Sequence, residues 1–281
     1  MSPTRFSGAG CSNRFLSMAQ PMTFAAWIKK KWRVNLIIYP CHLRLSNCGA
    51  PSSNCGMNNS LQPNSHGILT PIQKAFIQVF ANLPDHELFY LTGGTALAEF
   101  YLGHRLSYDL DFFTDVEGLI LPVSYQLERL AKDLDVKVVR RFSTFVELLI
   151  QQQGESLKID LALDSPFRFE PPILCPPGIK VNNFSDLCVD KLLAYYGRAE
   201  PRDAIDLFFI LQHQSSDMLY QLASQKDPGF DAYWFAVALN RCLNFPDEAD
   251  RWPVKMLIEW SPKKIKDLFQ SWAMRLMEEL N

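Results

Sequence analysis

Two aspartates stand one residue apart in an apolar run near the middle of the chain. Asp109 and Asp111 flank Leu110, and the run predicts a strand over about 109–113. Because side chains alternate between the faces of a strand, both carboxylates would point the same way, about 7 Å apart. Such carboxylates repel each other unless a cation lies between them, and Mg²⁺ prefers the oxygens of carboxylates and phosphates. The pair therefore predicts a divalent-metal site that also binds phosphate.

A glycine pair precedes these aspartates. Gly93 and Gly94 follow an apolar run at 88–91 and open a helix-like stretch at about 94–103. Glycine lets the backbone approach a ligand closely, and a helix N-terminus offers unpaired N–H groups to phosphate oxygens. Thr95 could add its hydroxyl to this cradle or cap the helix. Alone, an Asp-x-Asp is usually a solvated strand face and a glycine pair a tight turn, but together they favour a nucleoside triphosphate site.

The segment that holds these residues resembles the AbiEii-type nucleotidyltransferase family. The resemblance rests on Gly93–Ala98, Leu102–Arg105, Ser107 and Asp109–Phe113. It implies the polymerase-beta-like nucleotidyltransferase fold and transfer of a nucleotide from an NTP, with Mg²⁺ or Mn²⁺ as cofactor. It also implies that the protein is the toxin of a toxin–antitoxin or abortive-infection system for phage defence, with a cognate antitoxin.

A Lys-x-Asp sequence on a later strand matches a further motif of this family. Lys158 and Asp160 lie in an alternating stretch. By resemblance, Asp160 completes the metal-binding triad with Asp109 and Asp111 and can deprotonate the attacking hydroxyl. Asp164 is a competing candidate, but it adjoins a Ser-Pro pair at a strand end, so Asp160 is preferred. Alone, this pattern is also typical of a half-exposed strand.

Two motifs on helices complete the resemblance. The Asp186-x4-Lys191 spacing places Lys191 on a helix, where the family uses a lysine against the triphosphate. Arg202, Asp203 and Asp206 open an apolar helix, and its two aspartates lie on one helical face. By resemblance these residues shape the site and orient lysine or arginine partners. Each motif alone also fits a surface charge cluster or acids favoured by the helix dipole.

The predicted site comprises three overlapping sets of residues. The catalytic set is Asp109, Asp111, Asp160 and Lys191. The nucleotide-binding set is Gly93, Gly94, Thr95, Lys158, Lys191, Arg202, Asp203 and Asp206. The metal-binding set is Asp109, Asp111 and Asp160.

The distribution of charge does not mark an acceptor. The first 84 of the 281 residues hold 8 Lys+Arg and no acid, whereas the remainder holds 20 basic and 30 acidic residues, a net charge of −10. The resemblance points to the 3′ end of a tRNA, which would need a local basic patch. Candidates are Arg140, Arg141, Lys263, Lys264 and Lys266. Two alternatives stay open: an aminoglycoside-type small-molecule nucleotidyltransferase, which the acidic charge favours, and a non-catalytic nucleotide-binding partner.

The first 65 residues differ from the rest. They are rich in Ser, Asn and Pro, show no helical or strand period, and hold four of the seven cysteines without a Cys-x2-Cys metal spacing. We expect them to be disordered or a non-native leader, with Met57 as a candidate true start. Neither a membrane span nor a signal peptide is predicted, and the scattered later cysteines suggest free thiols in the cytoplasm.

The remaining chain is predicted to have two parts. Residues 66–182 mix strands and helices, and three adjacent strand-like runs over 136–163 favour a mixed or antiparallel sheet. Residues 183–281 have a helical pattern throughout. The expected fold is therefore α/β (α+β): a nucleotidyltransferase core with a mixed, largely antiparallel sheet flanked by helices, plus a helical C-terminal lobe, with the nucleotide in the cleft between them.

Overall fold

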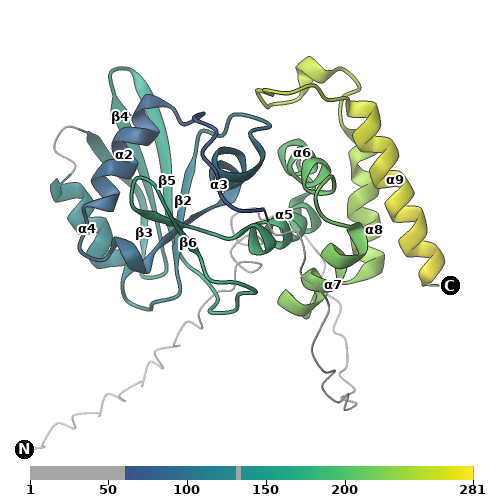
Figure 1. Ribbon diagram of the computed structural model, residues 1–281, viewed down its shortest axis with the longest axis horizontal. Coiled ribbons are helices and arrows are strands. Elements are labelled where there is room, and N and C mark those ends of the chain that lie inside the picture. Colours follow the sequence, from purple (N-terminus) through teal and green to yellow (C-terminus); the bar gives the residue numbers. More distant parts are fainter. Residues whose placement is uncertain (1–60, 131–133, 281) are drawn as a thin grey trace, which may run out of the picture.

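A seven-stranded mixed sheet forms the centre of the part of the chain that the computed structural model describes, residues 61–130 and 134–280 (Figure 1). Strands β2 and β5 pair parallel, as do β1 and β7, whereas the other neighbours pair antiparallel. The predicted mixed, largely antiparallel sheet is confirmed. In spatial order the strands are β3 (Asp135–Phe142), β4 (Phe145–Gln152), β5 (Glu155–Leu163), β2 (Leu110–Thr114), β1 (Tyr90–Thr92), β7 (Ile179–Val181) and β6 (Ile173–Cys175).

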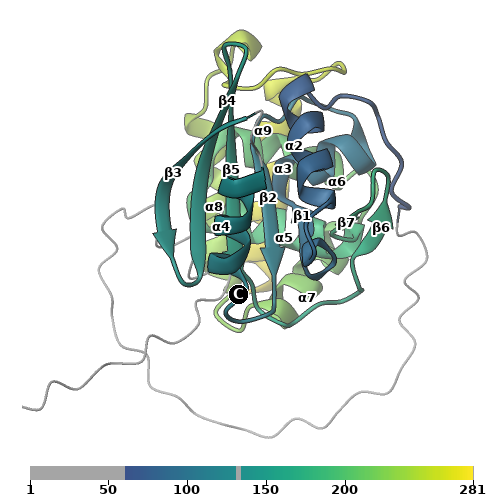
Figure 2. The same cartoon turned by 90° about the vertical axis from the view of Figure 1, so that its left-hand side faces the viewer.

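Alternation along β4 separates the two faces of the sheet. Val146, Leu148 and Ile150 are fully buried on one face, and Glu147 and Leu149 are half-buried on the other. Helices α2 (Pro71–Ala81) and α4 (Ile120–Leu130) cover the apolar face (Figure 2). The sequence period of two thus leaves one face polar, and this face is turned toward the C-terminal helices (Figure 1).

Helix α2 begins with a capping box. Thr70 accepts a hydrogen bond from the Gln73 backbone N–H, and the Gln73 side chain accepts one from the Thr70 backbone N–H, which together form a capping box. Phe80 of α2 then stacks on Phe112 of β2, with ring centroids 4.0 Å apart. This contact fixes the helix over the strand that follows Asp111.

The helix after the glycine pair is interrupted. Helix α3 (Gly93–Leu97) continues as a π-helix over Ala98–Leu102, and Gly103 ends it in the left-handed conformation, with φ of 59°. The π-helical turn buries Glu99, whose carboxylate accepts hydrogen bonds from the backbone N–H groups of Gly67 and Ile68 and from the Ser65 hydroxyl. Residues 61–65, which we assigned to the irregular leader, therefore include part of the folded unit; residues 1–60 lie outside the described part.

Helices form the C-terminal half of the molecule, as predicted. They are α5 (Phe184–Arg198), α6 (Pro201–Ile210), α7 (Ser216–Lys226), α8 (Ala232–Asn240) and α9 (Pro262–Glu279). Short 3-10 turns lie between α8 and α9, at Arg241–Asn244 and Ala249–Arg251, and before β1, at His86–Leu88. Tyr195 of α5 meets Phe269 of α9 at 5.1 Å, and Phe235 of α8 meets Trp272 at 5.0 Å. These contacts pack α8 and α9 onto the helix that faces the sheet.

Two further sequence expectations can be compared with the described residues. No helix there is both long and apolar enough to cross a bilayer. Cys175, Cys188 and Cys242 are free thiols, all buried. Burial raises the pKa of the Cys175 and Cys242 thiols to about 11, so these groups stay protonated at neutral pH.

Candidate active site

The polar face of the sheet presents a row of side chains in matched register. Asp111 on β2 pairs with Thr92 on β1 and with Asp160 on β5, which pairs in turn with Glu147 on β4. Paired residues of adjacent strands point to the same face. Asp109, two residues before Asp111, belongs to the same face because side chains alternate. The predicted trio of aspartates is therefore brought to one place.

A lysine lies among these carboxylates. The Lys158 Nζ atom is 3.0 Å from Asp160 Oδ2 and 3.6 Å from Asp109 Oδ2. Burial alone would lower the pKa of Lys158, but the carboxylates of Asp160, Asp111 and Asp109 outweigh it and raise the pKa well above its usual value. The three aspartates thus already stabilise one positive charge.

The donor atoms of these side chains determine whether a divalent metal would suit the site. The donors are hard carboxylate oxygens on one face, which is the ligand type that Mg²⁺ prefers. Asp109 and Asp111 reach the cavity, whereas Asp160 is fully buried and bonded to Lys158. As the described side chains stand, no three His, Cys, Asp or Glu converge to hold an ion. The residue types fit Mg²⁺. Because the Lys158 ammonium lies between these carboxylates, it would have to move for them to bind the ion together.

The glycine pair permits close packing around Asp111. Gly93 has φ of +74°, and a Cβ atom there would lie 2.2 Å from Asp111 Oδ2. At Gly94 a Cβ atom would lie 2.7 Å from Arg105 Nη2 and 2.9 Å from Ser107 Oγ. Both glycines line the cavity, as predicted. The close approaches seen here, however, are to side chains of the protein itself.

Thr95 does not have the predicted role. Its hydroxyl donates a hydrogen bond to the backbone carbonyl of Asp109, and its side chain is buried away from the cavity lining. The N-cap of α3 is Thr92 rather than Thr95. In this structure Thr95 therefore holds the backbone that precedes β2, and its hydroxyl is not among the groups that line the cavity.

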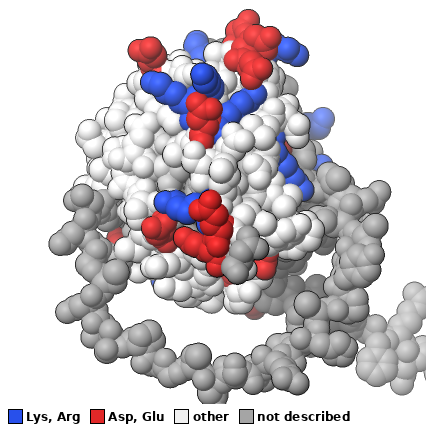
Figure 3. Space-filling model, turned by 90° about the vertical axis from the view of Figure 1, so that its right-hand side faces the viewer, with Lys and Arg blue, Asp and Glu red and all other residues white. Residues whose placement is uncertain are grey.

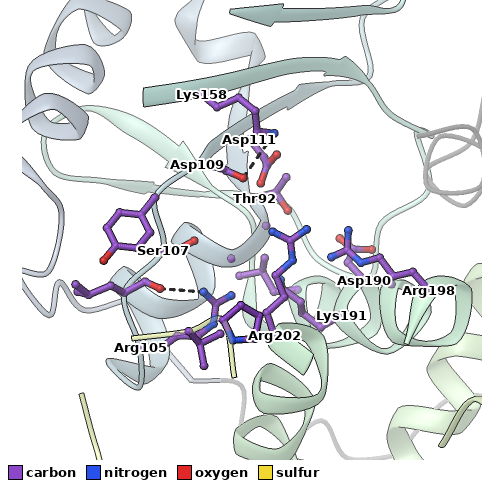
Figure 4. A pocket seen from close by; sticks show the side chains of 18 of the residues that line it. Thr92, Arg105, Ser107, Asp109, Asp111, Lys158, Asp190, Lys191, Arg198 and Arg202 are labelled. Carbon is purple, nitrogen blue, oxygen red and sulfur yellow. Dashed lines mark hydrogen bonds and ion pairs between the residues drawn. The ribbon is translucent and has the colours of Figure 1, made fainter. Parts of the chain in front are cut away.

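Basic side chains face the aspartates from the helical side. Lys191 and Arg198 come from α5 and Arg202 from α6, and Figure 4 shows them across the cavity from Asp109 and Asp111. The cavity has a volume of about 530 Å³. One face of α5 lines it, at three- and four-residue spacings: Leu187, Asp190, Lys191, Ala194 and Arg198.

The two aspartates of α6 hold these cations from behind. Asp206 is fully buried and lies 2.7 Å from Lys191 Nζ, while Arg105 donates two hydrogen bonds to it and His104 Nε2 lies 2.8 Å away. Burial alone would raise the pKa of Asp206, but Arg105 and Lys191 hold it well below its usual value. Asp203 binds the Arg198 guanidinium in a bidentate manner.

Asp203 and Asp206, both predicted to bind nucleotide, lie behind the cavity wall rather than in it. Neither lines the cavity, because both carboxylates are fully buried and occupied by basic partners. Asp206 binds Lys191 and Asp203 binds Arg198. These contacts agree with the expectation that the two aspartates orient lysine or arginine partners. Among the predicted nucleotide-binding residues, the cavity is lined by Gly93, Gly94, Lys158, Lys191 and Arg202.

Asp186, the first residue of its motif, also has a structural role. Its carboxylate is fully buried and accepts hydrogen bonds from the backbone N–H groups of Phe169 and Glu170 and from Lys226. Lys226 also lies 2.7 Å from Asp190, which does line the cavity. Burial raises the pKa of Asp190 to about 6, although Lys226 opposes the shift.

Several cavity residues were missed in the sequence. Arg198 could have been found, because it lies seven residues after Lys191 on the same helical face. Glu147 alternates with apolar neighbours in the sequence, and this pattern predicts which face of the strand it lies on. The pattern does not predict that Glu147 pairs with Asp160 on the next strand. The segment Pro253–Lys255 also lines the cavity, and no motif marks it.

The predicted basic patches are not continuous surfaces. Arg140 lines the cavity, 3.9 Å from Glu147, whereas Arg141 lies on the opposite face over the Tyr125 ring of α4. Lys266 is buried and bonded to the Phe245 carbonyl and to Asp247. On the face seen in Figure 3, basic and acidic side chains gather together.

The family match places the protein in the nucleotidyltransferase class. The chain belongs to the family described as "Nucleotidyl transferase AbiEii toxin, Type IV TA system", whose model matches residues 75–228. It is similar to the crystal structure of a candidate nucleotidyltransferase from H. pylori, with a TM-score of 0.48 and 16% identity over 75% of this chain and 97% of that chain. JHP933 from Helicobacter pylori is similar with a TM-score of 0.49 and 16% identity, over 74% and 90%. No match was found among curated proteins.

Proposed function

We propose that the cavity transfers a nucleotide from an NTP to the 3′ hydroxyl of an RNA, with tRNA as the expected acceptor. The new bond joins the acceptor oxygen to the α-phosphorus, and the bond to the β-phosphate breaks, so that pyrophosphate leaves. Stopping translation in this way would make the protein the toxin of a phage-defence pair. One observation supports the proposal above all: carboxylates on the sheet oppose basic side chains on α5 and α6 across a single cavity.

The basic side favours the triphosphate. Lys191, Arg198 and Arg202 add three positive charges to one wall, and two of them are held by buried carboxylates. Fixed cations stabilise charge that develops on the departing pyrophosphate without reorganising during the reaction. We assign these three residues and Lys158 to the donor phosphates, beside the backbone of Gly93 and Gly94.

The carboxylate side favours a divalent metal. Asp109, Asp111 and Asp160 would hold Mg²⁺ or Mn²⁺, which supplies neutralisation of phosphate charge and activation of the attacking hydroxyl. Asp160 would accept the proton of that hydroxyl. Because Asp160 is buried behind its bond to Lys158, this role needs Lys158 to leave the carboxylates when metal and nucleotide bind.

A small-molecule acceptor is the second candidate. Glu147 and Asp190 add carboxylates to the cavity lining beyond the aspartate trio. Such a lining attracts a cationic acceptor, for instance an aminoglycoside, and repels a polyanion. The basic side chain of Arg140 at the same edge partly offsets this preference.

Labelled nucleotides separate the candidates. The protein would be incubated with each α-labelled NTP and Mg²⁺, together with total tRNA or with a panel of aminoglycosides. We expect label on tRNA, and we expect Asp111→Asn to abolish it while Asp267→Asn, at an exposed position on α9, leaves it unchanged. Label only on the antibiotics would favour the second candidate, and binding without transfer to any acceptor would favour a non-catalytic partner.

A further inference from the structure

One side of the cavity has an apolar rim. Tyr108 lines the cavity and its side chain is 54% exposed. Phe113 is the other aromatic residue among the described lining residues, but it is only 3% exposed and offers no free ring face. Tyr108 therefore presents the aromatic surface that a ligand entering this cavity can reach.

A segment outside the matched family region completes this rim. Pro253, Val254 and Lys255 line the cavity, although the family match ends at residue 228. The Leu106 backbone N–H donates to the Lys255 carbonyl, and the Leu257 N–H to the His104 carbonyl, each at 2.9 Å. The segment is thus joined to the chain that leads into Tyr108.

The rim segment is anchored in the core. Trp252 is buried and packs edge-on against Phe245 and Trp260, with ring centroids 5.3 and 5.0 Å apart. Its indole N–H donates a hydrogen bond to the Pro246 carbonyl. Pro253 and Val254 are the apolar side chains of this segment, and a surface held this firmly can bind a ligand without being ordered by it.

We infer that Tyr108 and the segment Pro253–Lys255 bind the nucleobase of the donor nucleotide, with the Tyr108 ring stacked on the base. The inference rests on the proposed function. An NTP is charged at one end and planar and largely apolar at the other, and the cavity has the same division. Lys191, Arg198 and Arg202 suit the phosphates, and the rim is the part of the lining that suits a base.

Comparing an NTP with inorganic triphosphate isolates the base. Binding of each ligand would be measured by calorimetry for the wild-type chain and for Tyr108→Ala, Tyr108→Phe and Tyr125→Ala. Tyr125 serves as the control because it has a similar exposure of 51% but lies on α4. We expect Tyr108→Ala to weaken NTP binding by about fivefold or more, the usual range for loss of a stacked aromatic ring. Inorganic triphosphate should bind equally to all four proteins, and Tyr108→Phe and Tyr125→Ala should bind NTP as the wild type does.

Each other result decides against the base site. If wild-type protein binds NTP no better than triphosphate, or if Tyr108→Ala binds NTP normally, the inference is overturned while the proposed donor stands. If Tyr108→Ala raises only the KM for the RNA acceptor, the ring binds an acceptor base instead. If neither NTP nor triphosphate binds the wild type, the proposed function itself fails.

Discussion

Three basic residues of the cavity, Arg105, Lys191 and Arg198, are paired with carboxylates that do not line it. Asp206 is fully buried between Lys191, Arg105 and His104, and Asp203 fixes Arg198. A buried charge is tolerated only when partners compensate it, so these pairs are geometrically demanding. Lys191 and Arg198 are thereby held at the cavity wall by carboxylates that do not line it.

We expect Asp206→Asn to lower the free energy of unfolding by about 3–5 kcal/mol at neutral pH, because Arg105 and Lys191 lose a buried counter-charge. The pKa of Asp206 is depressed in the folded protein. Its stabilising effect is therefore complete above about pH 4, the usual range for an unfolded aspartate, and is lost as the pH falls through the lower folded value.

Urea unfolding at several pH values would measure this effect. The difference between Asp206→Asn and wild type should narrow as the pH falls below about 4. The exposed Asp267→Asn should match wild type within about 0.5 kcal/mol. An equal loss at neutral and acid pH would show that charge compensation is not the cause.

A second prediction concerns Lys158. We expect Lys158→Met to lower the melting temperature in EDTA, because three carboxylates lose the positive charge that they share. Mg²⁺ should then raise the melting temperature of the variant more than that of wild type, since the ion no longer competes with an ammonium group. Lys263→Met, at an exposed position on α9, serves as the control.

Calorimetric or fluorescence melting with and without Mg²⁺ would give the comparison. If Mg²⁺ raised the melting temperature of Lys158→Met no more than that of wild type, the Lys158 ammonium would not be competing with the metal for these carboxylates.

At the scale of the elements, the chain from His104 to Asp109 is clamped from two sides. Asp206 of α6 holds Arg105, and the segment 253–257 pairs with the backbone of residues 104–106. This chain links the glycine pair to the Asp-x-Asp strand. The C-terminal segment therefore positions the site as well as lining it.

We expect Trp252→Ala to lower the free energy of unfolding by about 3–5 kcal/mol, because it leaves a cavity beneath this segment. The exposed Trp234, at 57%, should tolerate the same change within about 0.5 kcal/mol. Denaturant unfolding of both variants would measure the effect. Similar values for the two would show that the segment is not anchored through Trp252.

The elements could largely be predicted from the sequence, but their contacts could not. The strand expected at about 109–113 and the helical pattern expected over 183–281 agree with β2 and with helices α5 to α9. The π-helical turn after Leu97 and the short strand β6 were missed, because long-range packing rather than local pattern determines them. Motifs identified Asp109, Asp111 and Lys191, whereas the buried contacts of Asp206 depend on His104 and Arg105, which lie far away in the chain.

At the scale of the whole molecule, one hydrophobic core extends from the sheet into the C-terminal helices. Phe112 of β2, Leu192 of α5 and Phe269 of α9 belong to the same buried cluster. The match to the family ends at residue 228, but the hydrophobic core continues into the residues beyond it. The helices beyond this point are part of the folding unit and not an appendage.

A chain that ends at Pro228 should therefore fail to unfold cooperatively. It would lack Phe235, Phe269 and Trp272, which bury the outer side of α5 and α6. Near-ultraviolet circular dichroism during urea unfolding would test this, with a chain ending at Glu279 as the control. A cooperative transition in the shorter chain would show that residues 61–228 form a sufficient core.

We propose that the carboxylates of the sheet and the cations of α5 form one site for nucleotidyl transfer. Mass spectrometry of RNA 3′ ends after incubation with NTPs and Mg²⁺ tests it most directly. We predict termini heavier by one or more nucleoside monophosphates with wild type and Asp267→Asn. With Asp111→Asn or Lys191→Met the yield should fall by about a hundredfold or more. Unmodified termini with folded wild-type protein, or full modification by Asp111→Asn, would show that these residues do not form a site for nucleotidyl transfer to RNA.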